Sequence, residues 1–401
     1  MKNRKIELLA PAGSLDRLKW AFDYGADAVY IGGRNFSLRA NATNFSLDEI
    51  KEACEYAHKL GKKVYVTVNI IFHNEDYLEL ENYLRVLASY KVDAIIVADI
   101  FILDLVKKLN IELPVHISTQ SSSMNKLSCR YLKSLGAERV VLGRELSKKE
   151  IKEIIDDTGI EVECFIHGAM CAAYSGRCVL SNYFTNRDAN RGGCSQICRF
   201  EFDLLDPSKN KVNSNIKFTM SCKDLSMITY IKEMIDINVS SLKIEGRMRS
   251  NYYIASVVDA YRHIIDSYYD NTLTDEKIKY YQKVLDKVSN RESIAQFFDG
   301  PVNYNHQYYL GRDEKSNQEF LGIVFNYDEE TKEVSLSERN FFKPGDEVEI
   351  FGPNKEAVSF VMPEIFDEFG NPLDAARHPE EIIKFKIDLP IKVNDLMRKK
   401  I

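Results

Sequence analysis

Five cysteines in the middle of the chain form its most reactive group of side chains. They lie between residues 171 and 222, with six, fifteen, three and twenty-three residues between successive members: Cys171, Cys178, Cys194, Cys198 and Cys222. In a reducing compartment, such a group indicates metal binding before disulfides. Four thiolates can hold zinc or an iron–sulfur cluster. The paired Cys-x-x-Cys knuckles of structural zinc sites do not occur, so the spacing favours an iron–sulfur cluster, with zinc or unligated redox thiols as alternatives.

The composition limits the chemistry that this chain can support. Its 401 residues include 54 Lys and Arg and 60 Asp and Glu, a formal net charge of −6. That balance argues against indiscriminate binding to polyanions, although a local basic pocket for RNA stays compatible with it. Neither a membrane span nor a signal-peptide pattern is visible, so we expect a cytoplasmic location and no membrane partner.

Short apolar strand patterns, each followed by a helical pattern, recur along the first 250 residues. A capping box of Ser46 and Glu49, for example, predicts a helix over Leu47–Leu60. Eight strand-and-helix units predict an α/β fold, a TIM-like (β/α)8 barrel, with a doubly wound open sheet as the alternative. The predicted strands are Ile6–Ala10, Ala28–Ile31, Lys63–Asn69, Ala94–Ala98, Val115–Ser118, Arg139–Leu142, Glu161–His167 and Ser240–Glu245.

Polar side chains stand where these predicted strands end. In a (β/α)8 barrel, the carboxyl ends of all strands meet at one mouth, which is where such barrels bind their ligands. We therefore expect a polar small-molecule pocket there, whose arginines would suit a ligand carrying carboxylates. The strand-end residues are Asn69, Asp99, Gln120, Arg144, Glu145, His167, Glu245 and Arg247.

The chain divides into three predicted regions. Residues 1–265 form the barrel, and an insertion at about 168–238, between its seventh and eighth strands, carries the five cysteines. Residues 266–317 are a predicted helical linker. From residue 318 the hydrophobic period becomes two, with turns at Pro344-Gly345 and Gly352-Pro353, which predicts a small C-terminal antiparallel β-barrel domain over 318–401.

Several segments together resemble the peptidase U32 family, the collagenase-like peptidases. The most specific are ECFIHGAMC at 163–171 and GRCVLS at 176–181. Supporting segments are ELLAPAG at 7–13, GADAVYIG at 25–32, NRGGC at 190–194, KDL at 223–225 and LKIEGR at 242–247. The resemblance covers about residues 5–360, and the order of its motifs is most similar to the branch that forms 5-hydroxyuridine in tRNA.

The resemblance implies a specific activity. Similar proteins hydroxylate RNA without oxygen, with an iron–sulfur cluster, here expected to be a 4Fe-4S cluster, and with prephenate as the hydroxyl donor. The implied cluster ligands are Cys171, Cys178 and Cys194, with Cys198 or Cys222 as the fourth. Family members often carry a cysteine directly after Lys-Asp-Leu, where this chain has Ser226, so the fourth ligand stays open. The expected partners are tRNA, the small-molecule donor and a paralogous U32 subunit.

We assign roles to the pocket residues accordingly. His167, Glu245 and Arg144 are the candidate catalytic residues, and the candidate substrate-binding residues are Asn69, Gln120, Arg191 and Arg247. Arginines interleaved with aromatic residues are candidate RNA contacts, because arginine binds phosphate and aromatic rings stack on unpaired bases. They are Arg187, Arg191, Arg199, Arg247 and Arg249.

Two other functions remain alternatives. The family name implies proteolysis, but neither a His-Glu-x-x-His metallopeptidase motif nor a Gly-x-Ser-x-Gly nucleophile elbow occurs. A cysteine nucleophile such as Cys171, paired with His167, is the form that a peptidase would take, although a thiolate bound to metal is not free to attack. The other alternative is a metal-stabilised interaction module without enzymatic activity.

Overall fold

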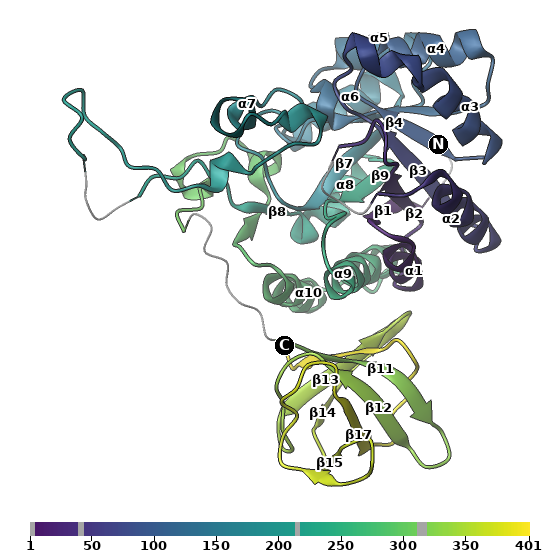
Figure 1. The fold of residues 1–401 in the computed structure, drawn as a ribbon, viewed down its shortest axis with the longest axis vertical. Helices are drawn as coiled ribbons and strands as arrows, with labels where there is room; N and C mark the ends of the chain where they lie inside the picture. Colours follow the sequence, from purple (N-terminus) through teal and green to yellow (C-terminus); the bar gives the residue numbers. More distant parts are fainter. Residues whose placement is uncertain (1–4, 39–43, 213–216, 311–318) are drawn as a thin grey trace.

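A computed structural model describes residues 5–38, 44–212, 217–310 and 319–401. Its larger part is a closed barrel of eight parallel strands (Figure 1). Strand β1 pairs with β2 and β9, and β9 pairs with β7, which completes the ring. The predicted (β/α)8 barrel is confirmed, and the open sheet is wrong. The barrel strands are β1 (Glu7–Pro11), β2 (Ala28–Gly32), β3 (Lys63–Val68), β4 (Ala94–Val97), β5 (Val115–Ile117), β6 (Arg139–Val141), β7 (Glu161–Gly168) and β9 (Ser241–Ile244).

Helices connect the strands and cover the barrel. Several of them begin at side-chain caps that the sequence shows: at the start of α2, Ser46 accepts from the amide of Glu49 at 3.2 Å, and the Glu49 carboxylate accepts from the amide of Ser46 at 2.7 Å. The helices are α1 (Leu15–Asp23), α2 (Leu47–Lys59), α3 (Leu80–Ser89), α4 (Phe101–Leu109), α5 (Lys126–Ser134), α6 (Lys148–Thr158), α8 (Ile231–Asp236), α9 (Asn251–Tyr269) and α10 (Asp275–Val288). Short 3-10 turns are η1 (Asn74–Leu78), η2 (Thr119–Ser121), η6 (Gln296–Asp299) and η7 (Tyr304–His306).

The barrel interior is ionic as well as apolar. Arg139 is 1% exposed, and its guanidinium lies 2.6 Å from the Glu7 carboxylate and 3.1 Å from that of Glu163. On the other side of Glu163, Lys243 lies 2.8 Å away. Buried charges persist only when they are paired and hydrogen-bonded, so these side chains must fold as one set.

The insertion between β7 and β9 extends away from the barrel at the left of Figure 1. It contains α7 (Leu180–Thr185), η3 (Ala189–Arg191), η4 (Ile197–Arg199), β8 (Asp224–Ser226) and η5 (Ile228–Tyr230). Strand β8 pairs antiparallel with the end of β7 and parallel with β10 (Ser293–Ile294), so the insertion returns to the barrel at its mouth.

The C-terminal part is a separate antiparallel sheet domain, as predicted, with its own apolar core. Its strand order is β14-β13-β18-β11-β12-β17-β15-β16. The strands are β11 (Phe320–Asp328), β12 (Glu333–Glu338), β13 (Glu347–Gly352), β14 (Lys355–Val361), β15 (Ile365–Phe366), β16 (Pro372–Leu373), β17 (Ile382–Lys386) and β18 (Leu396–Lys399).

The two domains pack together through aromatic side chains. Tyr252 of α9 stacks on Phe320 with ring centroids 4.3 Å apart, and Tyr24 after α1 meets the edge of Phe351 at 6.0 Å. The Tyr24 hydroxyl donates to the carbonyl oxygen of Asn394 at 2.9 Å. In the part of the chain that the structure describes, no helix is long and apolar enough to cross a membrane.

Candidate active site

The carboxyl ends of the barrel strands surround a small polar cavity of about 50 Å³. Five of the residues proposed from sequence line it together: Asn69, Gln120, Arg144, Glu245 and Arg247. The remaining lining side chains come from strand interiors and the loops that follow, and include Tyr30, Leu38, Thr67, Ser118, Phe165 and Lys243. The residues Asp99, Glu145, His167 and Arg191 do not line this cavity.

Lys243 provides a buried cation in this cavity that strand-end reasoning missed. It is 4% exposed, and its Nζ lies 4.3 Å from the centre of the Tyr30 ring and 5.5 Å from that of Phe165. Lys243 Nζ donates a hydrogen bond to Glu163 Oε1 at 2.8 Å. Alternation along the strand pattern Ser241-Lys243-Glu245 places these three side chains on one face, and that period of two was the signal that could have found Lys243.

The arginines of the mouth are held by specific contacts. Arg144 donates from Nη1 to the carbonyl oxygen of Ala169 at 2.7 Å, and its guanidinium lies 4.2 Å from the centre of the Phe165 ring. Arg247 is buried and donates to the Ser37 hydroxyl at 3.0 Å, and also to Thr67. The Tyr30 hydroxyl reaches Glu245 Oε2 at 3.3 Å. The cationic groups of Arg144 and Arg247 and the carboxylate of Glu245 therefore line the cavity together with Lys243.

His167 faces away from this cavity, because β7 carries a bulge. Phe165 pairs with Lys243, but His167 pairs with Ile244, so one extra residue shifts the alternation between them. The ring packs at 5.9 Å from Tyr253 and 5.7 Å from Tyr261, and Nδ1 lies 3.3 Å from the Tyr261 hydroxyl. Burial, assisted by nearby Arg249, lowers the pKa of His167 to about 3. His167 is therefore neutral at physiological pH.

The insertion is attached directly to the mouth. Ser122 donates from Oγ to the carbonyl oxygen of Ser175 at 2.6 Å. At Gly176, with φ of +78°, a Cβ would stand 1.9 Å from the carbonyl oxygen of Gln120, so only glycine permits this approach. Arg191 donates to Asp76 Oδ1 at 2.8 Å and to the carbonyl oxygen of Ile71 at 2.7 Å. Arg191 thus joins the insertion to the loop after β3.

Four of the cysteines gather in this insertion. Burial raises the pKa of the Cys198 thiol, Arg199 partly offsets that rise, and Cys171, Cys194 and Cys178 raise it again. All three of the other thiols therefore act electrostatically on Cys198. Burial also raises the pKa of Cys222, but Cys171 is the one cysteine that contributes there. These electrostatic contributions link Cys198 to all three of the other thiols and Cys222 to Cys171.

Arg199 donates to backbone carbonyl oxygens next to the cysteines and is not available to RNA. It is 4% exposed and donates to the carbonyl oxygens of Met170 at 2.7 Å and Cys222 at 3.3 Å. Asn190 likewise donates to the carbonyl oxygen of Cys178 at 2.9 Å. The expected RNA contact at Arg199 is wrong, and buried Arg247 is equally unable to reach a polyanion at the surface, because both guanidinium groups are enclosed by protein.

The donor set fits an iron–sulfur cluster in its chemistry. Cys171 and Cys194 are exposed, whereas Cys178 and Cys198 are half-buried, so at least two of the four thiols reach the surface. Thiolates are the usual ligands of such clusters. Within residues 5–38, 44–212, 217–310 and 319–401, no three His, Cys, Asp or Glu side chains are arranged to hold a single metal ion.

Comparison with known proteins identifies the family. Residues 13–308 match the description of Peptidase family U32, and residues 316–398 match the Peptidase family U32 C-terminal domain. The chain belongs to peptidase family U32. The barrel with its cysteine insertion and the C-terminal sheet domain therefore correspond to two recognised U32 units.

Three proteins similar to this chain carry different names. The chain is 48% identical over 401 residues to tRNA hydroxylation protein P1 of Bacillus subtilis, covering 99% of this chain and 95% of that protein. It is 38% identical over 270 residues to 23S rRNA 5-hydroxycytidine C2501 synthase of Escherichia coli, covering 67% and 40%. It is 33% identical over 325 residues to a collagenase of Porphyromonas gingivalis, covering 78% and 75%.

Proposed function

We propose that this U32 protein is an RNA-modifying hydroxylase that forms 5-hydroxyuridine at the tRNA wobble position, with prephenate as the hydroxyl donor. One observation carries the proposal: the insertion that gathers four thiols is attached to the rim of a polar, cationic cavity, at Gly176 and Ser175. Redox centre and donor pocket are then neighbours. The similarity to tRNA hydroxylation protein P1 over nearly the whole chain supports tRNA as the substrate.

The cavity residues bind and orient the donor. Arg144 and Lys243 present cations toward the space that a carboxylate would enter, and charge-assisted hydrogen bonds to a carboxylate are about twice as strong as neutral ones. Asn69 and Gln120 add amide groups that fix its orientation. Glu245 is the carboxylate positioned to hold or move a proton in the cavity. His167, neutral and enclosed by tyrosines, orients β7 rather than acting as an acid.

Cys171, Cys178, Cys194 and Cys198 are the proposed cluster ligands, with Cys222 as the alternative fourth. A bound cluster supplies electron transfer to the reaction. The protein holds the ligand loop in place through the contacts of Asn190 and Arg199 to the backbone. A cytoplasmic location and a paralogous U32 partner remain predictions.

A complementation experiment tests the function. A strain that lacks the gene should lose 5-hydroxyuridine from its tRNA, and the wild-type gene should restore it, whereas Cys178→Ala should not. Anaerobically purified wild-type protein should contain iron and sulfide, and Cys198→Ser should lose more of both than Cys222→Ser. Unchanged tRNA nucleosides in the deletion strain would contradict the proposal. An iron-free wild-type protein carrying zinc would contradict the cluster.

Proteolysis is the second candidate, because one relative is named collagenase. A cysteine peptidase needs a base beside its thiol. His167 is 3% exposed and lies between Tyr253 and Tyr261, so it does not serve an exposed thiol such as Cys171. Cleavage of gelatin by metal-free protein, blocked by alkylation, would nevertheless favour the peptidase, and inactivity would count against it.

A further inference from the structure

A groove of about 600 Å³ runs between the barrel and the C-terminal domain. It begins directly after Arg247 of the cavity, follows the start of α9 and ends against the C-terminal domain at the beginning of β11 and the end of β12. Its lining residues come from three segments: Met248, Arg249, Ser250, Asn251, Tyr252 and Tyr253 of the barrel; Val288 and Asn290 at the end of α10; and Phe320, Ile323, Arg339 and Asn340 of the C-terminal domain.

The groove is positively charged, although the whole chain is acidic. Among its described lining residues are two arginines and no carboxylate, in a protein whose formal net charge is −6. Arg249 lies over the Tyr253 ring at 5.2 Å, and Arg339 is oriented by hydrogen bonds to Ser337 Oγ at 2.8 Å and to the carbonyl oxygen of Glu338 at 2.9 Å. Within the described residues, these two guanidinium groups contact an aromatic ring, a hydroxyl and a carbonyl oxygen rather than a carboxylate. Both guanidinium groups therefore suit an external anion.

Apolar and amide groups complete the surface. Met248 is 56% exposed, and Phe320 lies flat on Tyr252, with an angle of 9° between the rings. Asn251, Asn290 and Asn340 also line the walls, where the Asn251 amide donates to Asp16 at 2.5 Å and the Asn340 amide donates to the carbonyl oxygen of Phe320 at 2.6 Å. Phosphate contacts from arginine, together with apolar contacts to unpaired bases, are what single-stranded RNA segments need.

The groove is already formed in the free protein. Its two walls belong to different domains, and the Tyr252–Phe320 stack joins them. Buried Arg398 of β18, which is paired within its own domain with Glu349 of β13 at 2.5 Å, adds a contact between the domains to Tyr280 of α10 at 3.2 Å. Because the walls are held together by these contacts, a ligand would not have to order them on binding, which favours affinity.

We propose that this groove binds the phosphate backbone of the RNA substrate, outside the cavity, with Arg249 and Arg339 as its phosphate contacts. The proposal rests on the function proposed above and assigns it an RNA-binding surface that includes the C-terminal domain. The position of Arg249, two residues after cavity-lining Arg247, places bound RNA next to the site of chemistry.

Binding of the full-length protein to tRNA tests this inference. Fluorescence anisotropy with a labelled tRNA transcript should be measured over a series from about 50 to 200 mM salt. Arg339→Gln should raise Kd by about threefold to tenfold and should reduce the slope of log Kd against log salt by about 1, because one phosphate contact is lost. Arg339→Lys should keep most of the slope, since the charge is retained.

The control is Arg377→Gln, an arginine of the same domain that lies outside the groove and is paired with Asp374 at 2.7 Å. It should bind tRNA as the wild type does. Equal Kd and equal slope for wild type, Arg339→Gln and Arg249→Gln, all folded by circular dichroism, would overturn the inference. Hydroxylation of tRNA by the wild type is measured separately. If the wild type hydroxylates tRNA but neither arginine substitution changes Kd, the proposed function stands and the RNA-binding role of the groove is rejected.

Discussion

At the scale of single residues, the buried carboxylate of Glu163 holds Lys243 in place beneath the cavity. Burial alone would raise its pKa, but Lys243 and Arg139 outweigh that effect and hold the pKa of Glu163 below its usual value. Glu163 is completely buried and accepts hydrogen bonds from both cations, at 2.8 and 3.1 Å. The cation that we assign to donor binding is thus maintained by a residue that never touches the donor.

Neutralising the Glu163 carboxylate should destabilise the folded protein. We expect Glu163→Gln to lower the free energy of unfolding by about 3–5 kcal/mol, because it leaves Lys243 buried without its partner. The matched control is Glu161→Gln, which removes a carboxylate from the same Arg139 but at a 26% exposed side chain. It should cost about 1 kcal/mol. Urea unfolding measures both, and equal effects would show that the ionic set does not depend on Glu163.

At the scale of elements, the important junction is the one between the cysteine insertion and the barrel mouth. The insertion approaches the 3-10 turn η2 so closely that the chain needs glycine at 176. The hydrogen bond from Ser122 to Ser175 and the one from Arg144 to Ala169 lie on either side of the same approach. The position of the thiols relative to the cavity therefore depends on backbone packing rather than on the cysteines themselves.

Substitution of this glycine should separate the insertion from the mouth. Gly176→Ala would place Cβ 1.9 Å from the carbonyl oxygen of Gln120 and would strain a positive φ, together costing about 1–3 kcal/mol or more. Hydrogen exchange should rise in residues 169–199, and iron content should fall. Gly61→Ala is the control, because Gly61 also has a positive φ, of +67°, but its Cβ would meet nothing within 4 Å. Unchanged exchange in the insertion of Gly176→Ala would contradict this account.

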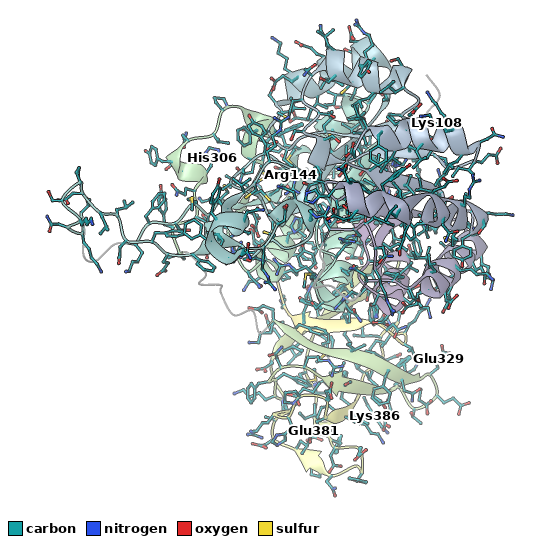
Figure 2. All side chains as sticks on the ribbon, turned by 45° about the horizontal axis from the view of Figure 1, so that its top comes forward. Lys108, Arg144, His306, Glu329, Glu381 and Lys386 are labelled. Atoms are coloured by element: carbon teal, nitrogen blue, oxygen red, sulfur yellow. The ribbon has the colours of Figure 1, made fainter. Side chains whose placement is uncertain are left out.

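At the scale of the whole molecule, the C-terminal domain is packed against the barrel as a fixed wall. Phe351 and Leu396 of that domain belong to the same apolar core as the barrel residues. The Arg398 guanidinium lies 4.2 Å from the centre of the Phe351 ring and is paired with buried Glu349. Figure 2 shows the sheet domain, with Glu329, Lys386 and Glu381 labelled, beside the larger barrel whose mouth contains Arg144. The groove exists only while this contact persists.

We expect Glu349→Gln to destabilise the C-terminal domain and its packing against the barrel by about 3–5 kcal/mol. The reason is that Arg398 would remain buried with its charge uncompensated. Small-angle scattering should then show a more extended molecule, and thermal unfolding should separate into two transitions. Glu347→Gln, on the same strand, is the control: its partner Lys400 is 3.2 Å away, and both side chains are exposed. It should change stability by about 1 kcal/mol or less. A single, unshifted transition for Glu349→Gln would refute the expected uncoupling.

The sequence by itself determined the elements and much of the cavity. Apolar runs and caps such as Ser46 with Glu49 are local signals, so the eight barrel strands and their helices could be predicted from them. Because parallel strand ends must meet at one mouth, Asn69, Gln120 and Glu245 could be placed together from the sequence.

The tertiary structure alone decided the partners of each side chain. The bulge in β7 turns His167 away from the cavity, and no periodicity reveals a bulge. Pairs such as Lys243 with Glu163 and Arg191 with Asp76 join residues 80 and 115 positions apart. Register and long-range pairing depend on the packing of the whole chain, whereas periodicity, capping and cysteine spacing are written in neighbouring residues. That difference is the physical reason that the elements were predictable and their contacts were not.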